Sequence, residues 1–91
     1  MRFENLETWA VFQLGPSAFD GLGVDLGAVR ALGINRGTYL RKVTESTDCY
    51  GRAEVISFRE GSQIITNHST WINLAFNCEV IPQVVEVRNA A

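Results

Sequence analysis

The feature that most constrains the fold is an apolar residue at every second position over 71–80. These apolar residues fall on one side of an extended chain, and they are Ile72, Leu74, Phe76, Cys78 and Val80. Because successive side chains of a strand point to opposite faces, this alternation predicts a strand that covers a hydrophobic core. Pro82 is expected to end or kink the strand, and residues 83–88 to form a last strand at a sheet edge.

Residues 50–88 as a whole are rich in the β-branched and aromatic residues that strands prefer. Segments 52–59 and 63–67 flank the sequence Glu60-Gly61-Ser62, which is typical of a turn, and together they predict a hairpin. The second half of the chain is therefore expected to form an antiparallel sheet of about three to five strands.

The first part of the chain is less clearly patterned. Residues 3–14 contain apolar side chains at helical spacing, before a Gly-Pro pair that is typical of a helix end. Residues 8–14 also have the content of a strand, and of the two structures we favour a helix over 3–14. Residues 15–27 hold four of the eight glycines and predict a loop, in which Asp25 would cap a helix over 26–32.

The stretch over 28–43 combines helical apolar spacing, a glycine where two helices could turn, and four cations with no acid. Gly33 is expected to break the preceding helix, and Asn35 to cap a further helix over 35–44. Two such helices predict a helix-turn-helix, whose second helix enters the major groove of DNA. The alternative is that residues 37–44 form another strand, since their β content is also high.

A known family shares this pattern. The run Gly33-Ile34-Asn35-Arg36-Gly37-Thr38, followed by Tyr39 and by Arg41-Lys42, resembles the C-terminal DNA-binding motif of the Fis family (factor for inversion stimulation) and related enhancer-binding regulators. The resemblance is confined to residues 28–43. It implies that Asn35 and Arg36 contact bases, and that Thr38, Arg41 and Lys42 contact phosphates. A hairpin behind three helices also suits a winged helix, another DNA-binding architecture.

With 91 residues, 46% of them hydrophobic, the chain is expected to form one α+β domain, residues 1–91, with N-terminal helices or loops followed by the sheet. Chains of this size often complete their burial of apolar surface by dimerising, so a homodimer is expected. The two cysteines lack metal-binding spacing, and the N-terminus is unlike a secretory signal. These features favour a cytoplasmic protein with free thiols.

Two functions from different classes follow. The first is a DNA-binding, transcription-regulating protein that uses the helix-turn-helix, although a net charge of −2 disfavours polyanion binding over the whole surface. The second is a β-rich module without catalysis that binds a protein or ligand. It would use either the glycine-rich loop over 15–27 or Trp71 and Asn73, which point away from the core face of their strand. Cover by the helical layer is the alternative for Trp71. The single histidine, His68, has no nearby partners in the sequence, so no enzyme, metal site or cofactor is predicted.

Overall fold

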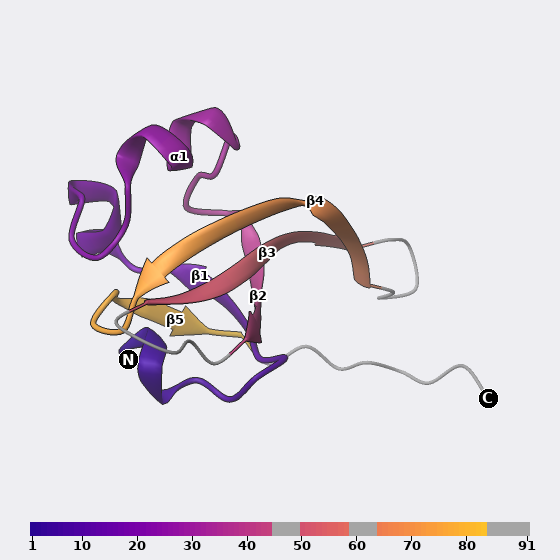
Figure 1. Ribbon diagram of the computed structural model, residues 1–91, viewed down its shortest axis with the longest axis horizontal. Helices are drawn as coiled ribbons and strands as arrows, with labels where there is room; N and C mark the ends of the chain where they lie inside the picture. Colours follow the sequence, from indigo (N-terminus) through magenta and orange to yellow (C-terminus); the bar gives the residue numbers. More distant parts are fainter. Residues whose placement is uncertain (45–49, 59–63, 84–91) are drawn as a thin grey trace.

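The computed structural model describes residues 1–44, 50–58 and 64–83, apart from the side chains of Thr44, Phe58 and residues 64–69. Within these ranges, five strands form one antiparallel sheet (Figure 1). The strands are β1 (Val11–Leu14), β2 (Tyr39–Thr44), β3 (Tyr50–Phe58), β4 (Ile64–Ala75) and β5 (Val80–Pro82). Their order across the sheet is β4-β3-β2-β1-β5, so β2 is the central strand.

The helical part of the described chain is small. It consists of one α-helix, α1 (Leu26–Ala31), and two short 3₁₀ helices, η1 (Phe3–Asn5) and η2 (Pro16–Asp20). In the view of Figure 1, α1 lies at the top and η1, in indigo, lies at the bottom near β5. The predicted α+β fold, with N-terminal helices followed by a sheet, is therefore wrong, and so is the winged-helix arrangement. The domain is closer to a small all-β fold.

Residues 3–14 do not form the favoured helix. They form η1 and then β1, so the strand alternative describes their second half correctly. Strand β1 is paired on both sides, with Phe12 opposite Leu40 of β2 and opposite Pro82 of β5. Backbone pairing with two strands from distant parts of the chain outweighs the helical spacing of a few apolar residues.

The helix predicted over 35–44 is also absent, because Tyr39–Thr44 is strand β2. Arg41 of this strand lies opposite Val11 of β1 and opposite Glu54 of β3. An isolated helix of this length is marginal in water, whereas a central strand forms hydrogen bonds along both of its edges. The alternative strand over 37–44 is thus the correct interpretation, beginning at Tyr39.

Helix α1 and its two ends match the prediction. The carboxylate of Asp25 accepts a hydrogen bond of 2.8 Å from the backbone N–H of Gly27 and so caps the N-terminus. At the other end Gly33 adopts a φ of 67°. The N–H of Ile34 then donates to the carbonyl of Val29 at 3.0 Å, which closes a Schellman motif and ends the helix.

The predicted hairpin is formed by β3 and β4, and its turn lies outside the described residues. Strand β4 is longer than expected, because it joins the second arm of the hairpin to the first half of the alternating segment and ends at Ala75. After a turn the chain crosses to the other edge of the sheet as β5. The last strand expected over 83–88 falls outside the described residues except for Gln83, which follows β5.

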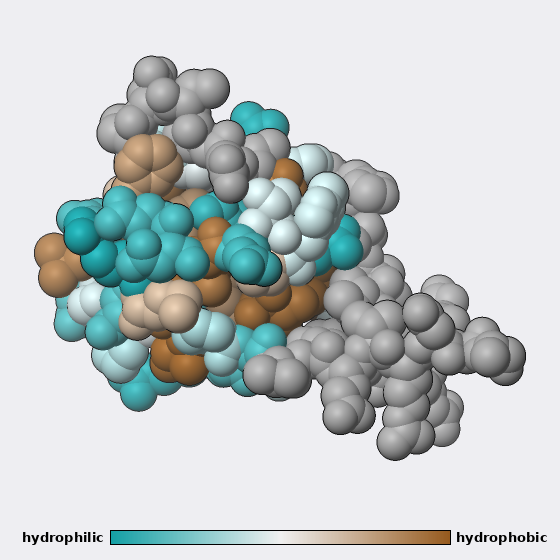
Figure 2. Space-filling view, turned by 90° about the horizontal axis from the view of Figure 1, so that it is seen from below, coloured by the Kyte–Doolittle hydropathy of each residue, from teal (hydrophilic) through white to brown (hydrophobic). Residues whose placement is uncertain are grey.

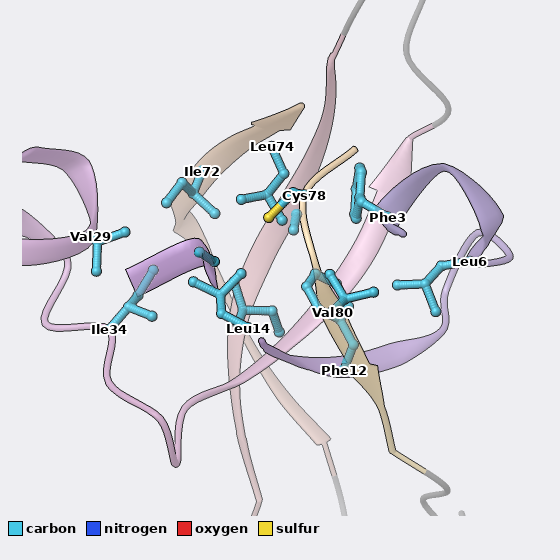
Figure 3. Close-up of a cluster of buried hydrophobic side chains, with 13 residues drawn as sticks. Phe3, Leu6, Phe12, Leu14, Val29, Ile34, Ile72, Leu74, Cys78 and Val80 are labelled. Atoms are coloured by element: carbon cyan, nitrogen blue, oxygen red, sulfur yellow. The ribbon is translucent and has the colours of Figure 1, made fainter. Parts of the chain in front are cut away.

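One hydrophobic cluster lies between the sheet and the helical segments (Figure 3). Every described element contributes to it, and its members are Phe3, Leu6, Phe12, Leu14, Ala18, Val29, Ile34, Leu40, Ala53, Ile72, Leu74, Cys78 and Val80. Four of the five apolar positions over 71–80 are buried as predicted, while Phe76 lies half-buried in the turn. The single strand predicted over 71–80 is wrong beyond Ala75, because the chain turns there and Val80 begins β5 at the other edge of the sheet.

Candidate binding surface on the outer sheet face

One row of paired residues crosses four strands of the sheet. It consists of Val11, Arg41, Glu54 and Trp71, each directly opposite the next. The residues beside them in the chain belong to the core cluster, and these are Phe12, Leu40, Ala53 and Ile72. Because side chains alternate along a strand and paired residues share a face, the row lies on the face turned away from the core. We call this the outer face.

Trp9 precedes β1 in a backbone conformation that is unusual for its residue type. The N–H of Ala10 donates to the carbonyl of Glu7 at 3.1 Å and closes a turn, in which Trp9 is the third residue with a φ of 75°. Glycine ordinarily occupies such a position, because a Cβ makes left-handed backbone unfavourable by about 1–2 kcal/mol. Trp9 is the one non-glycine residue of the described chain with a positive φ, and 61% of it is exposed.

An ion pair supports the ring of Trp9. The guanidinium carbon of Arg41 lies 4.9 Å from the ring centroid, within the range of a cation–π interaction. Nε and Nη2 of Arg41 both donate to Oε1 of Glu54, at 2.9 and 2.5 Å. Glu54 is 1% exposed, so it holds the guanidinium from the buried side. The ring of Trp9 is thus kept in a defined place without being buried.

A second aromatic–cation pair lies on the same face. The guanidinium carbon of Arg52 is 5.2 Å from the ring centroid of Trp71, and Asn73 lies opposite Arg52 in the neighbouring strand. Trp71 and Asn73 are both exposed and point away from the core, as predicted. Their role as an interface stays a prediction. Both tryptophans of the chain therefore contact an arginine on the outer face.

Three of the five predicted DNA contacts lie in one tight turn between α1 and β2. The N–H of Asn35 donates to Oγ1 of Thr38 at 2.9 Å, and Oδ1 of Asn35 accepts from the N–H of Gly37 at 2.8 Å. The side chains of Asn35 and Thr38 therefore form hydrogen bonds within the turn. Arg36 stands exposed between them.

The other two predicted contacts, Arg41 and Lys42, follow each other in β2 and point to opposite faces of the sheet. Lys42 is 4% exposed on the core side, where its Nζ donates to the carbonyls of Leu6 and Phe3 at 2.7 and 3.2 Å. Nζ also lies 4.8 Å from the ring centroid of Phe3. The five residues therefore do not share one exposed face, and the geometry of a helix-turn-helix is not formed over 28–43.

Sequence reasoning missed Trp9 and Arg52. The conformation of Trp9 is fixed partly by its own N–H, which donates to the carbonyl of Lys42 in β2 at 2.6 Å. No pattern near Trp9 in the sequence reveals that contact. The pairing of Arg52 with Trp71 likewise becomes visible only once the register of β3 and β4 is known.

The described residues offer little catalytic chemistry. Burial raises the pKa of the Cys78 thiol to about 11, and the negative charge of Glu79 adds to this effect. A thiol that stays protonated at neutral pH is a poor nucleophile, which agrees with the core position of Cys78. Among the same residues, no group of three or more His, Cys, Asp or Glu side chains is placed to hold a metal ion.

No helix in the described part of the chain is both long and apolar enough to cross a membrane.

On the side of the molecule that carries η1, the visible surface mixes hydrophilic and hydrophobic side chains (Figure 2). No family model, curated protein or solved structure matches this chain.

Proposed function

We propose that the protein is a non-catalytic interaction module that binds a protein partner through its outer sheet face, with Trp9 as the main contact. The observation that carries this proposal is the exposed tryptophan in left-handed backbone. A glycine would form the same turn without strain, and folding gains little from a side chain that is largely in solvent. Strain that folding does not require is characteristic of functional positions.

The support beneath Trp9 fits the same role. Binding is weakened when flexible side chains must be ordered at the interface. Here Arg41 is already fixed by Glu54 and lies over the ring, so Trp9 presents a large aromatic surface with little freedom left to lose. Trp and Arg are also the residue types that contribute most at protein interfaces.

A protein partner is favoured over nucleic acid by the placement of charge. Of the cations predicted to face DNA, Arg41 is neutralised by Glu54 and Lys42 is buried in the core. Nucleic acid binding depends on several cations that neutralise phosphates, and the chain as a whole carries a net charge of −2. A second copy of this chain, as in the predicted homodimer, is one form that the protein partner could take.

The experiment compares two exposed hydrophobic residues. Leu22 is 64% exposed, close to the 61% of Trp9, and it precedes α1 outside the outer face, so Leu22→Ala is a matched control for Trp9→Gly. Random dodecamer peptides displayed on phage are selected on the wild-type protein. The affinities of synthetic versions for each variant are then measured by fluorescence anisotropy. Light scattering reports the oligomeric state of the same variants, and a labelled DNA duplex at low salt is the nucleic acid probe.

We expect selected peptides to bind Trp9→Gly about 30-fold more weakly, since truncation of an interface hot spot costs about 2 kcal/mol or more. They should bind Leu22→Ala with unchanged affinity. A wild-type dimer that Trp9→Gly converts to a monomer would support the proposal with a second copy as the partner. Peptides that bind both variants equally, or salt-sensitive binding of the duplex without any peptide that depends on Trp9, would overturn it.

A further inference from the structure

An open pocket of about 190 Å³ lies where β1 passes into η2. Its walls are the side chains of Leu14, Pro16, Phe19 and Ile81, with Arg36 as the charged member. The lining thus joins three parts of the chain that are distant in sequence: the junction of β1 and η2, the turn after α1, and β5. Neither Trp9 nor Arg41 lines this pocket, so it is a separate site from the outer face.

The charged residue of the pocket, Arg36, is exposed. The turn that carries it is fixed by Asn35 and Thr38, whose side chains bond to backbone N–H groups within the turn. Within the described residues, the guanidinium of Arg36 has no hydrogen bond or ion pair, in contrast to that of Arg41. A planar guanidinium pairs with a carboxylate through two parallel hydrogen bonds.

The size of the pocket limits the apolar part of its occupant. Pockets for drug-sized ligands measure about 300–1,000 Å³, so this one suits a single aliphatic side chain. The α-carboxylate of a C-terminal residue lies one carbon from its side chain, which places an anion and an aliphatic group at close range. We propose that the pocket binds the hydrophobic C-terminal residue of a polypeptide, with its carboxylate on Arg36 and its side chain against Phe19 and Ile81.

The carboxylate of Glu79 does not take the place of such a ligand. Its Oε1 accepts hydrogen bonds from the backbone N–H and the hydroxyl of Ser17, at 3.0 and 3.1 Å. Glu79 is therefore hydrogen-bonded to η2, and the guanidinium of Arg36 is available to bind an anion of a ligand.

The test uses ¹⁵N–¹H NMR of the full chain, titrated with the tripeptide acetyl-Ala-Ala-Leu as its free acid. Three further ligands each lack one part of this tripeptide. Its C-terminal amide lacks the carboxylate, acetyl-Ala-Ala-Gly as the acid lacks the aliphatic side chain, and 4-methylpentanoic acid lacks the peptide backbone. Arg36→Gln removes the charge at the pocket. Arg30→Gln removes a charge that is also exposed, from α1, and serves as the matched control. The spectra also show whether each variant is folded.

We expect the leucine acid to shift the amide signals of Phe19, Gly37 and Ile81 with saturation. The amide should bind about fivefold more weakly, as for loss of one exposed ion pair, and the glycine acid should not saturate. Arg36→Gln should bind the acid no better than the amide, whereas Arg30→Gln should match the wild type. Equal affinities for acid and amide, or no effect of Arg36→Gln, would overturn the proposal. Binding of 4-methylpentanoic acid as tight as that of the peptide would overturn the polypeptide as the ligand.

Discussion

The ammonium of Lys42 donates a hydrogen bond of 2.7 Å to the carbonyl oxygen of Leu6 on the core side of the sheet. A second bond from the same Nζ reaches the carbonyl of Phe3 at 3.2 Å. The carbonyl of Phe3 also accepts a hydrogen bond of 3.1 Å from the N–H of Leu6, which closes η1. The carbonyl of Leu6 lies just beyond the end of η1, where a cation is well suited to satisfy it. One side chain of the central strand therefore fastens η1 to the sheet.

Lys42→Met should lower the free energy of unfolding by about 1.5–3 kcal/mol, the range for hydrogen bonds that involve a charged group. Methionine fills a similar volume but leaves the buried carbonyl of Leu6 without its donor. Urea unfolding followed by circular dichroism measures the change. Arg30→Met, on the exposed side of α1, is the control and should differ little from the wild type. Equal stability of both variants would contradict a structural role for Lys42.

Trp9→Gly should be more stable than Trp9→Ala by about 1 kcal/mol, because alanine keeps the Cβ that strains left-handed backbone. This order is the reverse of the usual one, in which alanine is favoured because it restricts the unfolded chain. The same pair of substitutions at Glu7, an exposed residue of the same turn with ordinary backbone, should show alanine as the more stable variant. Thermal unfolding of the four variants measures these differences in stability. If the alanine variant is more stable than the glycine variant at both positions, the backbone at Trp9 is not strained.

Arg41→Met should cost about 3 kcal/mol, because it leaves the carboxylate of Glu54 buried without its partner. The double variant Arg41→Met/Glu54→Leu should recover most of this loss, since both charges are then gone from the outer face. Chemical unfolding of the single and double variants forms a double-mutant cycle. A double variant that is less stable than Arg41→Met would show that the pair contributes through packing and not through charge.

The stability of the protein should fall in acid partly through Glu79. Hydrogen bonds from the backbone N–H and then the hydroxyl of Ser17 lower the pKa of Glu79 below its usual value. A carboxyl group whose pKa is lower in the folded state stabilises the fold above the pKa of the unfolded chain. It loses this contribution as pH falls through the lowered value. Urea midpoints between pH 7 and pH 3 should therefore decline less steeply in Glu79→Gln than in the wild type. Glu7→Gln is the control, and a decline in Glu79→Gln as steep as in the wild type would contradict the assignment.

Some of the fold was predictable because the responsible interactions lie within a few residues of each other. Asp25 bonds to Gly27 two residues on, and Gly33 ends α1 through backbone that only glycine adopts easily. The burial of Ile72 and Leu74 follows from alternation along their own strand. Trp71 was correctly placed on the face away from the core for the same reason.

Other parts depended on contacts between distant segments. Residues 39–44 have the composition of either a helix or a strand, and their position between β1 and β3 decides for a strand. The cations of 28–43 look alike in the sequence, yet Lys42 enters the core and Arg36 stays in solvent. Helical spacing over so few residues is a weak signal. It led to the prediction of a DNA-binding helix over 35–44, where the fold instead forms strand β2.

The sequence by itself determined the strand-rich second half, the ends of α1 and the outward position of Trp71, since each follows from local periodicity or from a local hydrogen bond. Only the tertiary structure decided the sheet order, the left-handed turn at Trp9 and the ion pair beneath it. The physical reason is that strand pairing is long-range. Lys42 must lie beside Trp9, and Glu54 opposite Arg41, before the backbone and side chains of the outer face have a defined place.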